Sequence, residues 1–231
     1  MEVRPGFCIV TENRKEKKMD KVLHRAATRG HADHGWLDTY HTFSFADYYD
    51  PKRIHFGALR VLNDDTVAPG EGFGTHPHAN MEIVSIPLSG ALRHRDSMGY
   101  VQELRPGGIQ VMSAGTGITH SEFNASDTEP VKFLQIWVLP DARGHRPRYD
   151  QLTLAPAVRN ELRPIVAPEG FGNEHVGWIH QRAWFHTLDL DAGRGADYRL
   201  RLFGDGVYLF VLEGCVETAG ETLSRRDGLG I

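Results

Sequence analysis

Short runs of β-branched and aromatic residues, separated by Gly, Pro, Asn and Asp, follow one another along the chain from His41 onward. Such runs have the composition of strands, and the residues between them are those that form turns. The expected strands span residues 41–45, 57–63, 74–78, 82–88, 91–94, 100–104, 109–113, 117–123 and 131–139. No stretch shows a sustained helical period. This spacing predicts an all-β sandwich or barrel, in which the doubly apolar run 131–138 is a central strand.

The succession of short expected strands ends at residue 139, and a second set of expected strands follows later in the chain. Residues 139–170 contain five prolines, which predicts a connection between two halves. The strands expected after it span residues 183–190, 198–203, 207–212, 215–219 and 222–223. The sequence of 87–90 and 103–109 is echoed by 211–214 and 221–229, so we expect the second half to repeat the barrel of the first.

These patterns divide the chain into four parts: a disordered lead at 1–18, a first barrel at 19–140, a connection at 141–170 and a second barrel at 171–231. The lead is polar and ends in a charged run, and we expect translation to begin at Met19. Only three residues follow Gly228, whereas about thirty follow the equivalent Gly108 before its half ends. The second barrel is therefore expected to lack its last strands and to leave edges prone to association.

Composition excludes several classes of function. The 231 residues carry a formal net charge of -4 without a basic stripe, which argues against direct nucleic-acid contact or binding to an anionic membrane. The basic clusters at 143–148 and 225–226 are expected to be solvated faces. Two cysteines form no disulfide framework, and neither a secretory core nor an apolar stretch of membrane-spanning length occurs. We expect a cytoplasmic protein.

Two short segments carry the candidate chemistry. His76 and His78 are two residues apart in one expected strand, and His120 and Glu122 are two apart in another. Alternate residues of a strand point to the same face, so facing strands would bring three imidazoles and one carboxylate to one point. Such a donor set suits Fe, Mn, Co, Ni, Cu or Zn and leaves open positions on the ion. The alternative is that the four side chains only cap a polar barrel mouth.

These residues belong to patterns that resemble the cupin superfamily. The first motif runs from Gly70 through His76, His78 and Glu82 to Gly90, and Pro106-Gly107-Gly108 resembles the second motif. Val111 stands where that second motif has a histidine. The segment 113–122, from Ser113 to Glu122, is instead similar to the pirin family of two-barrel cupins, which the chain resembles over nearly everything after Met19.

The resemblance implies two tandem jelly-roll-like cupin β-barrels with one divalent metal in the first and none in the second. Its metal ligands match His76, His78, His120 and Glu122, with Fe2+ the usual occupant and Zn2+, Mn2+, Co2+, Ni2+ or Cu2+ as alternatives. Glu82, a ligand in generic cupins, is expected to form a hydrogen bond behind the site.

His31, His34 and His41 are expected to be structural or to lie at the rim of a pocket. The spacing of His31, His34 and His41 fits neither a strand face nor a helix, and His94 precedes a turn signature and is expected at a hairpin end. The segment Gly115-x-Gly117 is not a phosphate loop, because no helix-forming segment follows it.

Bacterial pirin-like proteins are associated with quercetin 2,3-dioxygenase activity, which opens a flavonol ring with O2 and releases CO. In this hypothesis Glu122 is the catalytic base that accepts the flavonol 3-hydroxyl proton, and Phe45, Phe73 and Met81 are candidates to hold the flat substrate. A second hypothesis is a metal-dependent regulatory protein that binds a protein partner, as eukaryotic pirins do. A third is a metal-free binding module for a small acid or sugar.

Overall fold

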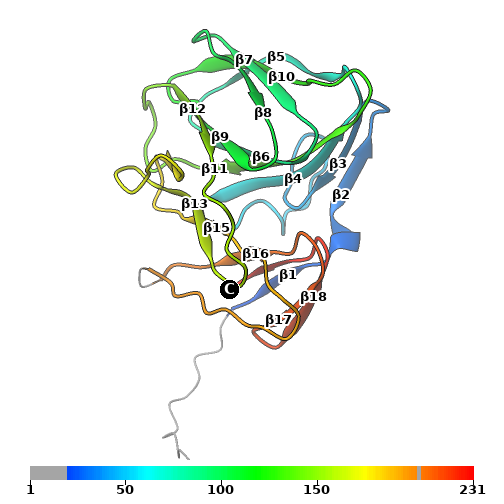
Figure 1. Ribbon diagram of the computed structural model, residues 1–231, viewed down its shortest axis with the longest axis vertical. Helices are drawn as coiled ribbons and strands as arrows, with labels where there is room; N and C mark the ends of the chain where they lie inside the picture. Colours follow the sequence, from blue (N-terminus) through cyan, green and yellow to red (C-terminus); the bar gives the residue numbers. More distant parts are fainter. Residues whose placement is uncertain (1–19, 202–203) are drawn as a thin grey trace, which may run out of the picture.

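The computed structural model describes residues 20–201 and 204–231, and in this part of the chain the secondary structure is almost entirely β (Figure 1). One 3-10 turn, η1 (Ala26–Thr28), interrupts the strands. No helix within these residues is both long enough and apolar enough to span a bilayer. The expected lead at 1–18 and the start at Met19 lie outside the described residues.

The N-terminal half consists of two antiparallel sheets (Figure 1). The larger has the order β12-β9-β6-β11-β4-β3-β2, and the smaller has the order β5-β10-β7-β8. The strands of the larger sheet are β2 (Gly30–Asp33), β3 (Leu37–His41), β4 (Leu59–Val67), β6 (Glu82–Ser89), β9 (Gly108–Ser113), β11 (Val131–Val138) and β12 (Arg148–Thr153). Those of the smaller sheet are β5 (Gly72–His78), β7 (Leu92–Asp96), β8 (Val101–Leu104) and β10 (Ile118–Asn124).

Strand β11 occupies the centre of the larger sheet, between β6 and β4, as its doubly apolar pattern predicts. Phe133 points into the barrel, where it packs with Leu92 and Leu104 of the smaller sheet. Leu134 and Ile136 point outward into a second core, which includes Ile165 and Ile179 of the C-terminal half. Because each buried aliphatic or aromatic side chain contributes about 1.5–3 kcal/mol, these two layers stabilise the barrel and attach the second half to it.

The connection expected at 141–170 is structured. Strand β12 lies within it and pairs with β9, so this segment extends the larger sheet of the N-terminal half. The same segment also contains β13 (Arg163–Pro168), which pairs with β14 (Gly177–Ile179) and β15 (Phe185–Thr187). The prolines are accommodated at strand ends and at an irregularity between Pro164 and Val166.

The rest of the C-terminal half is built around a strand from the beginning of the chain. Strand β1 (Val22–His24) pairs with β19 (Gly228–Gly230), which pairs on its other side with β16 (Tyr208–Phe210). Figure 1 shows the blue and red ends of the chain side by side here. A hairpin of β17 (Cys215–Thr218) and β18 (Glu221–Ser224) precedes β19. Residues 198–201, where a strand was expected, form none.

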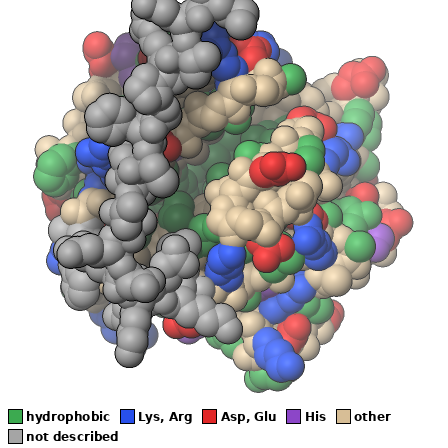
Figure 2. Space-filling view, turned by 90° about the horizontal axis from the view of Figure 1, so that it is seen from below, with side chains coloured by type: hydrophobic (Ala, Val, Ile, Leu, Met, Phe, Trp, Pro, Cys, Tyr) green, Lys and Arg blue, Asp and Glu red, His purple; other side chains and the backbone are tan. Residues whose placement is uncertain are grey.

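Two glycines allow β19 to sit between its neighbours. A Cβ at Gly228 would lie 2.2 Å from the Tyr208 hydroxyl oxygen, and one at Gly230 would lie 2.4 Å from the Phe56 ring. Figure 2 shows the molecule from the side of this half, where acidic and basic side chains are interspersed around a hollow with hydrophobic walls. Both charge signs are present among the side chains that the view leaves uncovered.

Candidate metal centre

Strands β5 and β10 bring the three predicted histidines together. His76 and His120 are directly opposite each other in the register of the two strands, and His78 is opposite Ile118. The Nε2 atom of His120 lies 3.0 Å from Nε2 of His78 and 3.0 Å from Nε2 of His76. His120 is buried, whereas His76 and His78 are half-buried and reach the site from its open side. The alternation of strand side chains therefore produces the predicted convergence of imidazoles.

The protonation of the rings makes this cluster suited to a cation. His76 Nδ1 donates to the carbonyl oxygen of Gly74 at 2.7 Å, which leaves its Nε2 as a lone pair directed at His120. Two nitrogen ligands at about 2.1 Å from one ion lie about 3.0 Å apart at right angles and about 3.4 Å apart in a tetrahedron. Both separations measured from His120 fit the right-angled arrangement, which leaves further positions for other ligands.

Burial keeps the imidazoles of His78 and His120 neutral. Desolvation, with the neighbouring His120 and His76, lowers the pKa of His78 to about 4. Desolvation, with the neighbouring His76 and His94, lowers the pKa of His120 to about 3. A neutral imidazole offers the lone pair that a metal requires, so both ligand positions are available without competition from protons near pH 7.

Glu122 lies beside His120 but does not join the three-histidine group. Its carboxylate and the nitrogens of His94 and His120 lie within 4.8 Å of one another. The carboxylate is held by three neutral donors from the larger sheet: Gln135 at 2.8 Å, Gln110 at 3.1 Å and Ser85 at 3.4 Å. The structure thus places Glu122 at the floor of the barrel, next to the histidines, and its bond to an ion remains a prediction.

A second pair of residues supports His120 from behind, and the sequence analysis did not identify it. His94 lies 3.4 Å from His120, Nδ1 to Nδ1, and its Nε2 lies 2.9 Å from Oδ2 of Asp96. His94 does not end a hairpin: it is fully buried within β7 and stacks on Tyr149 at 4.3 Å between ring centres. The signal that could have found the pair is the same spacing of two residues that identified His76 and His78.

Glu82 is buried but lies outside both groups of potential ligands among the described residues. It accepts hydrogen bonds from Ser113 Oγ at 2.7 Å and from the backbone N–H of His180 at 3.2 Å. Burial raises the pKa of this carboxyl group. The expected hydrogen bond to the metal site is not present; Glu82 instead connects the barrel to the C-terminal half through His180.

The expected aromatic clamp is only partly next to the site. Phe73 packs edge-on against Trp36 and lies 6.5 Å from the His76 ring, whereas Met81 packs into the core around Ile83. Phe45 contacts Trp137, and it is Trp137 that lies against the His78 ring at 4.9 Å. Sequence reasoning missed Trp137 because the run 131–138 is apolar on both faces and therefore indicates only a buried strand.

A cavity of about 630 Å³ opens beside His78. Its walls are formed by Pro77, His78, Ala79, Ser97, Gly117, Ile118 and Thr119. This volume is within the range of small-molecule sites, most of the lining is apolar or small, and one histidine of the cluster, His78, is part of it.

His31 and His41 lie outside the histidine cluster and contact other polar side chains. His31 Nε2 lies 2.7 Å from Asp38 at the surface, and His41 Nδ1 lies 2.9 Å from Asn63 in the interior. Within the described part of the chain, both groups of potential metal ligands belong to the N-terminal half.

Comparison with known proteins places these features in a family. Residues 22–138 match the Pirin family, and residues 165–231 match the Quercetinase C-terminal cupin domain. The chain is 56% identical over 209 residues to a quercetin 2,3-dioxygenase of Escherichia coli K12, covering 90% of this chain and 88% of that protein. It is 40% identical to a pirin-like protein of Caulobacter vibrioides over 87% of this chain and 86% of that one.

A solved structure shows the same fold. The bacterial pirin YhhW of Escherichia coli in complex with nickel(II) superposes with a TM-score of 0.86 at 40% identity, covering 92% of this chain and 90% of that one. The two-cupin architecture expected from the sequence is therefore confirmed.

Proposed function

The chain belongs to the pirin family, and from this premise we propose that it is a metal-dependent dioxygenase that opens flavonols such as quercetin with O2 and releases CO. The observation that carries the proposal is the convergence of three imidazole Nε2 atoms, one of which, that of His78, belongs to a residue that also lines a cavity. The naming of the Escherichia coli relative as a quercetin 2,3-dioxygenase supports the substrate class.

The donor set fits one divalent transition metal held by His76, His78 and His120, with Glu122 as the fourth ligand. Iron(II) is the proposed occupant; the nickel complex of the Escherichia coli relative supports a site of this kind without fixing the metal here. When bound, the ion supplies the redox and Lewis-acid chemistry that reaction with O2 requires.

The chain itself positions the substrate and handles its proton. The cavity beside His78 admits the flat flavonol, and the Trp137 ring fixes the orientation of the His78 imidazole. Glu122 accepts the proton of the flavonol 3-hydroxyl group, while Gln135, Gln110 and Ser85 hold its carboxylate in one orientation.

The proposal is tested by purifying the protein under nitrogen, quantifying its metals and then following loss of quercetin absorbance together with CO in air. His76→Ala is expected to lose metal and turnover, whereas Glu122→Gln keeps much of the metal and loses turnover. His55→Ala, an exposed histidine whose Nδ1 contacts Gly57, is the matched control and is expected to keep both. Iron-loaded protein that leaves flavonols unchanged would overturn the proposal and favour the regulatory hypothesis.

A further inference from the structure

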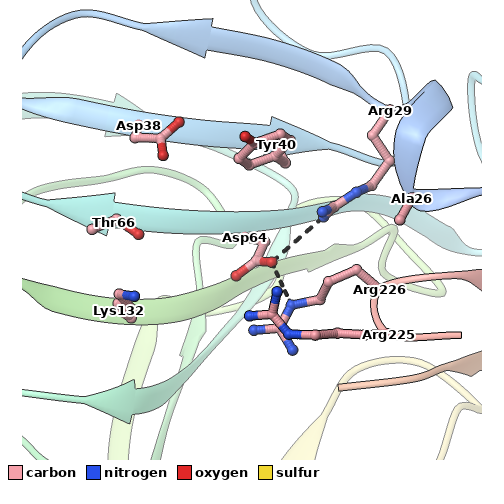
Figure 3. A pocket seen from close by; sticks show the side chains of 9 residues that line it. All are labelled: Ala26, Arg29, Asp38, Tyr40, Asp64, Thr66, Lys132, Arg225 and Arg226. Atoms are coloured by element: carbon pink, nitrogen blue, oxygen red, sulfur yellow. Dashed lines mark hydrogen bonds and ion pairs between the residues drawn. The ribbon is translucent and has the colours of Figure 1, made fainter. Parts of the chain in front are cut away.

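A second cavity, of about 370 Å³, lies on the opposite side of the larger sheet from the barrel interior, where the turn after β18 meets strands β3, β4 and β11 (Figure 3). Its lining residues are Ala26, Arg29, Asp38, Tyr40, Asp64, Thr66, Lys132, Arg225 and Arg226. The volume is within the range of small-molecule sites. The proposed dioxygenase reaction uses none of these residues.

Arg29 is the most unusual side chain in this cavity. It is only 5% exposed, yet its Nε and Nη1 atoms have no hydrogen-bond acceptor among the described residues. The nearest carboxylate oxygen, Oδ2 of Asp64, lies 3.6 Å from Nη1. The guanidinium carbon lies 4.8 Å from the centre of the Tyr40 ring. A guanidinium carries five N–H donors, and three of them, on Nε and Nη1, have no hydrogen-bond acceptor here, although Nη1 pairs with Asp64 at 3.6 Å. The site can therefore accommodate a further acceptor.

Positive charge exceeds negative charge in the cavity, although the whole chain is acidic. Asp64 is shared, because its Oδ2 also lies 2.6 Å from Nε of Arg226. Figure 3 shows this carboxylate between the two guanidinium groups. Lys132 also lines the cavity and forms no ion pair within residues 20–201 and 204–231. Two carboxylates, Asp38 and Asp64, therefore face four cations, Arg29, Lys132, Arg225 and Arg226. Asp38 also pairs with His31, and Arg225 also pairs with Glu213.

The backbone of Arg226 is strained at the position from which its guanidinium reaches Asp64. Its φ angle is +65°, in the left-handed region that favours glycine, and its guanidinium also donates to the carbonyl oxygen of Leu212. The side chain is 9% exposed, so the expectation that residues 225–226 form a solvated face is wrong for Arg226 and holds for the exposed Arg225.

We propose that this cavity binds the oxyanion group, a phosphate or a carboxylate, of a small molecule. Arg29 and Lys132 supply the charge. The planar guanidinium of Arg29 matches the oxygens of both anions, and the ammonium of Lys132 adds a point charge. The volume exceeds that of a lone oxyanion, and the Tyr40 ring and the Thr66 hydroxyl offer contacts to the remainder of the ligand. A bound anion would link the β18–β19 turn to the sheet of the N-terminal half.

The test is calorimetric titration of the full-length, metal-loaded protein with inorganic phosphate and, separately, with succinate at constant ionic strength. Lys132→Gln, a change at an exposed position, is expected to raise the Kd about tenfold, because one charge-assisted contact is lost. Arg29→Gln is expected to abolish binding where it folds. The control is Arg93→Gln, an exposed arginine on β7 that pairs with Glu103, and it keeps the wild-type Kd.

The two titrations also identify the ligand chemistry. Binding of phosphate with a lower Kd than succinate supports a phosphorylated ligand, and the reverse supports a carboxylate. Turnover of quercetin stays unchanged in Lys132→Gln, so the outcome is independent of the dioxygenase proposal. Absence of binding up to ~20 mM of either anion, or a wild-type Kd in Lys132→Gln, overturns the inference, because the cavity would then have no affinity even in the millimolar range.

Discussion

Replacing Asp96 with Asn is expected to weaken metal binding, although Asp96 does not reach the site. His120 can bind an ion through Nε2 only with its proton on Nδ1, and that N–H then donates to Nδ1 of His94, 3.4 Å away. His94 must in turn carry its proton on Nε2, where it donates to Oδ2 of Asp96 at 2.9 Å. The carboxylate of Asp96 therefore fixes the tautomers of both rings.

The amide of Asn is expected to donate an N–H to Nε2 of His94. This would move the proton of His94 from Nε2 to Nδ1. His94 would then hold its proton on Nδ1, opposite the Nδ1–H of His120, and two donors would face each other. Loss of such a supporting contact costs about 10–100-fold in metal affinity, which corresponds to about 1.4–2.7 kcal/mol. Oδ1 of Asp96 accepts from the backbone N–H groups of Met98 and Tyr100, and the Asn oxygen retains both bonds. The hairpin turn is thus preserved.

Competition with a chromophoric chelator for Ni2+ or, under nitrogen, Fe2+ measures the affinity, and the d–d spectrum of Co2+-loaded protein reports the ligand geometry. Asp47→Asn, at an exposed position, is the matched control. The melting temperature of the metal-free protein is expected to change little, which separates positioning from folding. An affinity within twofold of wild type and an unchanged Co2+ spectrum would refute the tautomer argument.

Two further predictions concern stability. Burial raises the pKa of Asp65 to about 7, so the folded state holds this proton more tightly than the unfolded state, and stability falls as pH rises from about 3.8 through about 7. Asp65→Asn should therefore raise the melting temperature at pH 8 but not at pH 4; equal gains at both values would contradict the linkage. A Cβ at Gly72 would lie 2.3 Å from the Glu122 carbonyl oxygen, so Gly72→Ala should lower both the melting temperature and metal affinity, whereas Gly74→Ala, with nothing within 4 Å, should change neither.

The sequence predicted the parts of the fold that depend on local pattern. Alternation in strands follows from the backbone, so His76 and His78 had to share a face once their segment was a strand. The three-residue strands β1 and β14 were not predicted, because they are strands only through pairing with other segments and their own residues carry no strand pattern. Val22 lies opposite Gly230, at the other end of the sequence, and no local signal indicates that contact.

The support around Glu122 shows why the rest of the site could not be predicted. Gln110 and Ser85 are fully buried, although glutamine and serine in a strand usually indicate a solvent-facing side. Apolar residues at these positions would pack a barrel interior without requiring hydrogen bonds, whereas a buried carboxylate requires donors such as these. Each donor is explained by Glu122, which lies in a different sheet. The floor of the site is therefore formed by two sheets that face each other across the barrel, and it can be recognised only when the positions of both sheets are known.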